Sequence, residues 1–146
     1  MDFRYKPLEV RPSKSSARKS VVFRPIIPVY LIGSKKMVDY EALIDSGADY
    51  NVFHSEIADI LGIRYKNGKK RRIFGLGDQE IKGYECDVEI KLQGFGKYAA
   101  TIIFSNQIPE NSYGVLGSKR FFDRYLVSFN YPGKVISISR SKIQLD

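Results

Sequence analysis

Short segments in which apolar and polar residues alternate make up most of this chain, and such alternation is typical of β-strands with one solvated face. Val88, Ile90 and Leu92 give the cleanest case, since polar residues stand between them. Residues 25–33 (PIIPVYLIG) are apolar and interrupted by proline, which favours an edge strand. Residues 37–45 (MVDYEALID) predict the next strand, and the turn residues between the two segments predict that they pair as a hairpin.

Further hairpins are expected along the chain, each marked by a glycine-bearing turn. Residues 71–104 predict two hairpins in series, with turns near residues 75–78 and 94–96. The last hairpin joins residues 126–130 to residues 135–139 through the turn sequence Tyr-Pro-Gly-Lys. The strand pattern therefore continues almost to the end of the chain.

One short helix is predicted after the hairpin that ends near position 45. Ser55 is a candidate cap for this helix, and Gly62 is a candidate end. Between them, Ile57, Ile60 and Leu61 would share one face.

A second and briefer helix is expected to begin at Ser118, where a serine side chain can cap it. The sequence has no internal repeat and no coiled-coil heptad. The pattern as a whole predicts an all-β domain, mostly antiparallel, with one or two short helices.

The length of 146 residues suits one domain with a real core, and a hydrophobic content of 43% indicates a globular chain. Residues 1–21 are polar and basic, and they predict a flexible arm that Phe3 and Tyr5 could pin to the body. Residues 22–141 are expected to form the domain, and residues 142–146 a short C-terminal tail.

Positive charge is concentrated in two segments. Residues 1–24 contribute +5 and residues 64–72 contribute +6 to the net charge of +8, which leaves −3 for the rest. Such clusters can bind phosphate backbones, but more often they are solvated segments that aid solubility. Aromatic and basic residues do not interleave as in a stacking platform, so nucleic acid is a weakly supported partner.

Composition disfavours several other kinds of chemistry. With one histidine, His54, and one cysteine, Cys86, the sequence has no ligand set for zinc and no internal disulfide. Residues 75–80 begin Gly-Leu-Gly but lack the third glycine and the following helix of a dinucleotide site. No apolar stretch approaches the ~18 residues of a membrane span, and the N-terminal residues lack a signal core. We therefore expect a soluble, cytoplasmic protein with no membrane partner, no metal and no organic cofactor.

Asp45 is the main candidate for chemistry because it follows directly on the apolar run Ala-Leu-Ile. An ionised carboxylate at such a place needs hydrogen-bond donors or becomes neutral. Gly47 permits a tight turn, Ser46 can donate a hydroxyl hydrogen bond, and the small Ala48 leaves room for a substrate backbone.

A single carboxylate is a weak catalyst for hydrolysis, whereas two carboxylates that share a proton can activate a water molecule. The chain has no second Asp-Ser-Gly or Asp-Thr-Gly, so a partner acid would come from a second copy across a two-fold axis. Without that copy, Asp45 is a turn residue.

Residues 42–49 (ALIDSGAD) resemble the active-site signature of the retropepsin-like aspartic proteases, which are single-domain enzymes that work as homodimers. The order of the later segments is also similar: a loop and short helix, a basic connection, and a glycine-bearing flap hairpin at residues 73–81. Residues 114–117 (GVLG) resemble the segment that lies beside the catalytic loop in that family. The resemblance covers roughly residues 22–140, and it implies a closed, mainly antiparallel barrel that hydrolyses peptides or proteins.

The resemblance also implies a role for each matched residue. Asp45 would be the catalytic acid and base, and Ser46 would tie the two catalytic loops together across the dimer. Gly47 would offer its carbonyl to the substrate, while Ala48 and Asp49 would line the cleft. The remaining matched residues, Gly75, Leu76 and Gly77, would form a mobile flap tip that covers the bound peptide.

Two departures from the family pattern bear on the dimer and the loop. Many relatives carry Asp or Asn two residues after the Val-Leu-Gly glycine, whereas this chain has Ser118-Lys119-Arg120. No obvious counterpart exists of the terminal strands that form the dimer sheet in the retroviral enzymes. An aspartic endopeptidase is therefore the first hypothesis. The alternative is a non-catalytic module of the same fold whose basic arm and loop engage nucleic acid or an acidic partner.

Overall fold

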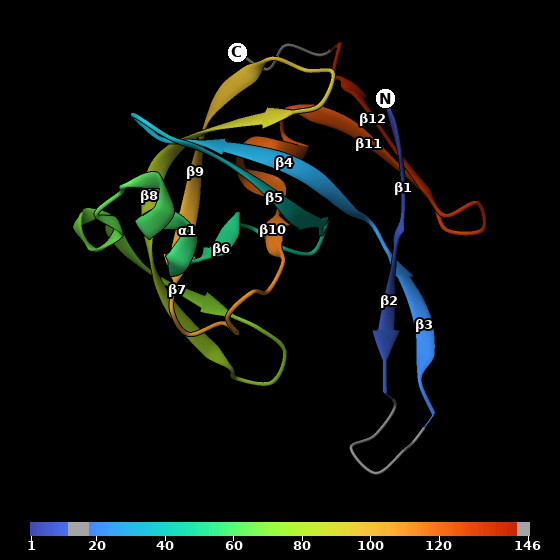
Figure 1. Cartoon of the computed structure of the whole chain (residues 1–146), viewed down its shortest axis with the longest axis horizontal. Coiled ribbons are helices and arrows are strands. Elements are labelled where there is room, and N and C mark those ends of the chain that lie inside the picture. Colours follow the sequence, from blue (N-terminus) through green and yellow to red (C-terminus); the bar gives the residue numbers. More distant parts are fainter. Residues whose placement is uncertain (12–17, 143–146) are drawn as a thin grey trace.

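The computed structural model describes residues 1–11 and 18–142, and it is built mainly of β-strands (Figure 1). The elements and their bounds are β1 (Asp2–Arg4), β2 (Lys6–Val10), β3 (Ser20–Arg24), β4 (Ile26–Ile32), β5 (Met37–Ile44), β6 (Val52–His54), α1 (Ser55–Leu61), the 3-10 turn η1 (Tyr65–Asn67), β7 (Lys69–Phe74), β8 (Glu80–Leu92), β9 (Lys97–Ser105), β10 (Gly114–Leu116), the π-helical turn η2 (Ser118–Phe122), β11 (Tyr125–Asn130) and β12 (Val135–Arg140).

The main sheet closes into an approximate barrel, as the sequence predicted. Its strand order is β4-β5-β10-β6-β9-β8, and a second pairing of β4 with β8 closes the ring, while β7 extends the sheet from β8. Most of these pairs are antiparallel, but β10 runs parallel to β5 and β6 runs parallel to β9. The two parallel pairs surround the loop that follows β5, so this loop is held from both sides.

Strand β8 belongs to both the barrel and a projecting hairpin. Residues Glu89 to Leu92 pair with β4, whereas residues Glu80 to Glu85 pair with β7. Gly83, within the part that pairs with β7, lets β9 approach closely, because a Cβ there would lie 2.6 Å from the side chain of Ile103 and 2.7 Å from the Phe104 carbonyl oxygen. We call the β7–β8 pair and its connecting turn the flap hairpin below.

The barrel is filled by aliphatic and aromatic side chains that alternate with solvated residues along each strand. Gly114 leaves space for the ring of Phe53, which a Cβ at that position would overlap. The largest fully buried side chains are Phe53, Phe104, Phe121, Ile27, Leu31, Ile57, Leu61, Ile90, Leu92, Ile102, Ile103 and Leu116.

Helix α1 lies where the sequence predicted it, but its cap is a different residue. His54 precedes the helix, and its Nδ1 accepts a hydrogen bond from the Glu56 amide at 3.0 Å. Gly62 ends the helix in the left-handed conformation with φ of 73°, as expected. Ile60 was expected on the buried face, yet 50% of it is exposed. The buried face of the helix centres on Ile57 and Leu61 instead.

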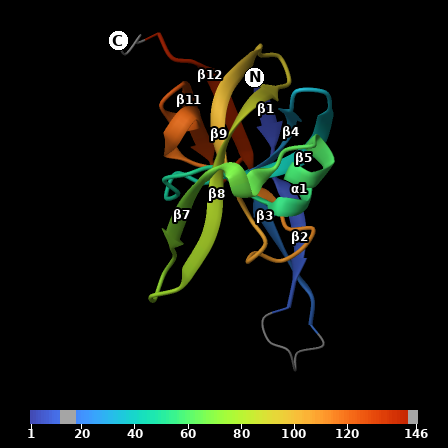
Figure 2. The same ribbon diagram turned by 90° about the vertical axis from the view of Figure 1, so that its left-hand side faces the viewer.

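The N-terminal segment differs from the expected flexible arm. Phe3 and Tyr5 are buried, as predicted, and strand β1 between Asp2 and Arg4 pairs with β12. Strands β2 and β3 then form a hairpin of their own, and the predicted arm residues 12–17 lie outside the described residues. Figures 1 and 2 show this hairpin and the flap hairpin extending from the same end of the barrel. Leu8 and Val10 alternate with polar residues in β2, and β3 holds three apolar residues in a row, which are the local signals for this hairpin.

The segment after β10 is less regular than the short helix predicted there. Ser118 is its first residue, but no side-chain hydrogen bond caps it, and Lys119 and Arg120 have non-helical backbone angles. The closing hairpin of β11 and β12 forms as predicted. Within the described part of the chain, no helix has the length and apolar character needed to cross a membrane.

Candidate active site

Asp45 begins a tight loop at the end of β5. Its amide donates to the carbonyl oxygen of Leu116 at 3.0 Å, and the Ala48 amide donates back to the Asp45 carbonyl at 3.2 Å. The Gly47 amide donates to the Asp45 carboxylate oxygen Oδ1 at 2.9 Å. Asp45 is half-buried, while Ser46 and Gly47 are exposed. The loop thus fixes one carboxylate oxygen from within and keeps the acid in contact with solvent.

Strand β10 braces this loop along its length. Leu116 lies opposite Ile44 in the parallel register, which confirms that the Gly-Val-Leu-Gly segment runs beside the loop. Beyond the strand, the amides of Ser118 and Lys119 donate to the carbonyl oxygens of Ala48 and Asp49 at 2.8 and 3.0 Å. The loop therefore continues the sheet by backbone pairing and has little freedom to move alone.

Gly117 allows the two segments to approach closely. A Cβ at this position would lie 2.5 Å from the Ala48 carbonyl oxygen and 2.8 Å from that of Tyr50. Both neighbours are backbone atoms, which cannot move aside without shifting the loop itself. A side chain at position 117 is therefore incompatible with the observed loop.

Asn51 joins the loop to two further segments from a fully buried position. Its Oδ1 accepts the Gly117 amide at 2.9 Å, and its Nδ2 donates to the carbonyls of Thr101 and Lys119 at 3.0 and 3.1 Å. With 1% exposure, the side chain has no water to replace these partners. Because these partners are 50 or more residues away along the chain, no local pattern in the sequence predicts this role of Asn51.

The flap hairpin and the Asp45 loop enclose a cavity of about 680 Å³. A smaller cavity of about 340 Å³ adjoins the same acid and is lined mainly by apolar side chains, including Ile73, Ile81 and Val115. A groove of this size with one acid at its base can hold an extended peptide segment. The larger cavity is lined by Asp45, Gly47, Ala48, Asp49, Tyr50, Val52, Arg72, Ile73, Phe74, Gly75 and Leu76.

Most of the residues that the sequence predicted as site residues thus lie around one cavity. Two of them do not line it: Ser46 is exposed on the loop, and Gly77 lies in the flap turn with φ of 70°. Leu76 at the flap tip is 98% exposed, although large apolar side chains are rarely left so open. In a single chain, nothing in the described residues covers this leucine.

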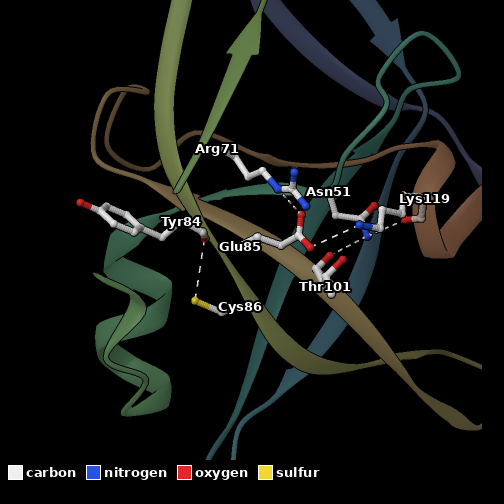
Figure 3. Close-up of polar contacts among 7 residues, drawn as sticks. All are labelled: Asn51, Arg71, Tyr84, Glu85, Cys86, Thr101 and Lys119. Atoms are coloured by element: carbon white, nitrogen blue, oxygen red, sulfur yellow. Dashed lines mark hydrogen bonds and ion pairs between the residues drawn. The ribbon is translucent and has the colours of Figure 1, made fainter. Parts of the chain in front are cut away.

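A charged cluster of Arg71, Glu85 and Lys119 has no counterpart in the sequence predictions (Figure 3). The Glu85 carboxylate on β8 accepts from Arg71 Nε at 3.0 Å and pairs with Lys119 Nζ at 3.2 Å. Burial of Glu85 opposes its ionisation, but the hydrogen bonds from Lys119 and Arg71 outweigh burial and lower the pKa of the carboxyl. Because the three residues come from separate elements, no spacing in the sequence could have joined them.

Ion pairs hold part of the basic segment of residues 64–72 against the rest of the flap hairpin. Arg71 is held by Glu85, and Arg72 lies 3.0 Å from Glu80, whereas Lys69 and Lys70 are exposed. Half of the arginine and lysine residues in β7 therefore belong to ion pairs of the flap hairpin. Their charge is partly neutralised within the chain.

Cys86, next to Glu85, is half-buried with its Sγ 3.4 Å from the Tyr65 carbonyl and 3.8 Å from that of Tyr84 (Figure 3). Burial, with smaller contributions from Asp87 and Glu85, raises the pKa of its thiol. A thiol of raised pKa is a poor nucleophile.

Comparison with known proteins gives a shared fold. No protein-family model and no curated protein sequence matches the chain. Among solved structures, a retropepsin-like aspartic protease from Rickettsia conorii superposes with a TM-score of 0.54 at 14% identity, over 78% of this chain and 79% of that chain. EIAV protease complexed with the inhibitor HBY-793 superposes with a TM-score of 0.49 at 24% identity, over 65% of this chain and 82% of that chain. The superposition on the Rickettsia conorii structure shows that the chain has the retropepsin-like aspartic protease fold.

Proposed function

We propose that this protein is an aspartic endopeptidase that acts as a homodimer, with one Asp45 from each copy. The observation that carries the proposal is the position of Asp45: a half-buried carboxylate at the base of a groove beneath the flap hairpin. The shared fold supports a protease in general. The pairing of two acids and the dimer belong to the proposal.

The proposed reaction uses a proton shared between two Asp45 carboxylates. Two carboxyl groups within a few ångströms of each other do not both ionise, because the two negative charges would repel, so one acid stays neutral and the other is charged. The charged acid accepts a proton from a water molecule, which attacks the peptide carbonyl. The neutral acid donates its proton to the carbonyl oxygen as the tetrahedral intermediate forms. The first acid, now protonated, gives its proton to the nitrogen as the C–N bond breaks, and the second acid takes a proton back from the intermediate, which releases a carboxylic acid and an amine and restores the shared proton. No metal or organic cofactor takes part.

The other residues of the loop and flap take supporting roles in this proposal. Ser46, which is exposed beside Asp45, ties the two loops together across the two-fold axis. Gly47 offers its carbonyl to the substrate backbone, and Ala48 and Asp49 form the cleft wall. The flap tip, which comprises Gly75, Leu76 and Gly77, closes over the peptide and excludes water.

The test is cleavage of a peptide library by the wild-type chain and by Asp45→Asn. The amide cannot share the proton, so the variant should lose cleavage while keeping the thermal unfolding midpoint of the wild type. Asp39→Asn is the matched control, because Asp39 is an exposed acid on the same strand β5. Unchanged turnover by Asp45→Asn would remove Asp45 from the reaction.

A second measurement tests whether two acids share one site. A tandem chain joins two copies through a flexible linker, with Asp45 intact in one copy and Asp45→Asn in the other. If both acids are needed, this mixed dimer should be as inactive as a tandem chain that carries Asp45→Asn in both copies. Half of the wild-type activity would show that each copy works alone.

A further inference from the structure

The charged cluster of Arg71, Glu85 and Lys119 lies at the junction of three parts of the site. Arg71 belongs to β7, which leads to the flap tip, and Glu85 belongs to β8 on the returning side. Lys119 follows β10, and its amide is bonded to the Asp49 carbonyl in the Asp45 loop. One carboxylate therefore connects the base of the flap to the segment that braces the loop.

The same two cations contact the ring of Tyr50. The Arg71 guanidinium carbon is 5.8 Å from the ring centroid, and Lys119 Nζ is 5.7 Å from it. Both distances fall within the range of a cation–π contact. Tyr50 lines the larger cavity together with Asp45, so the position of its ring decides the shape of that part of the groove.

Glu85 is the member on which the cluster depends. Its side chain is 12% exposed, against 27% for Arg71 and 42% for Lys119. Two cations that face one aromatic ring repel each other, and a buried carboxylate between them offsets this repulsion. Without the charge of Glu85, Lys119 has enough exposure to turn toward solvent and leave the ring.

From these contacts we propose that Glu85 is a positioning residue: through Arg71 and Lys119 it holds Tyr50 as a fixed wall of the substrate groove and ties the flap base to the Asp45 loop. The inference rests on the proposed peptidase function and deepens it. Glu85 touches no reacting atom, so it acts on substrate binding. Tyr50 is the residue through which it selects the side chain that the groove accepts.

The kinetic test is a double-variant cycle of Glu85→Gln and Tyr50→Ala, measured with one cleaved peptide. Each single variant should raise KM about fivefold or more and leave kcat within about twofold, because binding is lost and the reacting acids are untouched. The double variant should raise KM no further than Tyr50→Ala alone, since both changes remove the same wall. Tyr50→Phe keeps the ring and should behave as wild type.

Glu89→Gln is the matched control for the charge change. Glu89 lies on the same strand and also pairs with a lysine, Lys97, at 3.5 Å, but it does not line the groove. Its KM should equal that of the wild type. If Glu85→Gln unfolds, Lys119→Gln replaces it in the cycle, because that side chain is more exposed and its loss leaves Arg71 with Glu85.

Hydrogen exchange gives a readout that needs no activity. The Lys119 amide and the amides of β7 should exchange several-fold faster in Glu85→Gln than in Glu89→Gln. An unchanged KM in Glu85→Gln, additive effects in the cycle, or unchanged exchange of the Lys119 amide would each overturn the inference. If the wild type cleaves no peptide, the proposed function fails, and the exchange rates alone decide whether Glu85 ties the flap base to the loop.

Discussion

The amide of Asp45 lies 3.0 Å from the carbonyl oxygen of Leu116, and this bond makes the acid the first residue beyond the paired part of β5. The strand pairing positions the acid, and the carbonyls of Ala48 and Asp49 then accept from the amides of Ser118 and Lys119, which follow Leu116 in the chain. The Gly47 amide bond to Oδ1 adds to these backbone bonds, so both the main chain and the carboxylate of Asp45 are held. Such preorganisation is what a proton-sharing pair needs.

Gly117 should be among the least replaceable residues of the chain. Gly117→Ala places a Cβ against the Ala48 and Tyr50 carbonyls, and we expect it to lower the free energy of unfolding by roughly 1–3 kcal/mol. Chemical denaturation measures this change. Gly96→Ala is the control, since no atom lies within 4 Å of a Cβ there, and it should change stability little. Equal stability of the two variants would contradict the close approach.

Replacement of Asn51 by the similarly sized leucine should also be costly. Asn51→Leu leaves the Gly117 amide and the Thr101 and Lys119 carbonyls without this partner in a buried place. We expect a loss of unfolding free energy on the order of 3 kcal/mol. The exposed Asn106 offers the comparison, and Asn106→Leu should stay close to wild type. A small effect at both positions would mean that water satisfies the groups around Asn51.

Stability should depend on pH through Glu85. Its pKa is lower in the folded chain than its usual 4.5, so its ionised form stabilises the fold above that pH. The contribution fades as the pH falls from about 4.5 through the lowered pKa, where the folded chain also takes up the proton. Unfolding free energies of wild type and Glu85→Gln should therefore differ most near pH 6 and converge in acid. A difference that grows toward low pH would contradict this direction.

The exposed leucine of the flap tip should matter for substrate and hardly for folding. Leu76→Ser removes a side chain that is 98% exposed, so the thermal unfolding midpoint should stay within about 2 °C of wild type. If the flap closes over a peptide, the lost apolar contact should raise KM about fivefold. Leu126→Ser is the control, because Leu126 is 66% exposed on β11. An equal KM in both variants would leave the flap tip without contact to substrate.

Local patterns in the sequence predicted the elements well. Alternation marked most strands, and Gly62 marked the end of α1, because these signals act within a few residues of the chain. The helix cap was wrong because His54 satisfies the first-turn amide with Nδ1, a role that Ser55 suits better by residue type alone. Tertiary contacts decided between the two.

Only those residues of the candidate site that belong to a recognisable sequence motif could be predicted. Asp-Ser-Gly-Ala and the flap glycines pointed to one cavity, and the structure places most of these residues around it. No such signal marked Asn51, Glu85 or Lys119. Most of their hydrogen bonds join residues that are 34 or more positions apart in the sequence. Contacts of that range depend on the register of the whole barrel, which no local pattern contains.

The double membership of β8 has a mechanical consequence. One half of the strand pairs with β4 and the other half pairs with β7 of the flap hairpin, so a rotation of the strand near the Arg71–Glu85 pair would carry the flap with it. Leu76 lies five positions after Arg71, a reach of at most about 16 Å at the usual strand rise. A rotation of about 10° at the Arg71–Glu85 pair would then move Leu76 by about 3 Å. A small rotation in the barrel wall would thus become a larger displacement at Leu76.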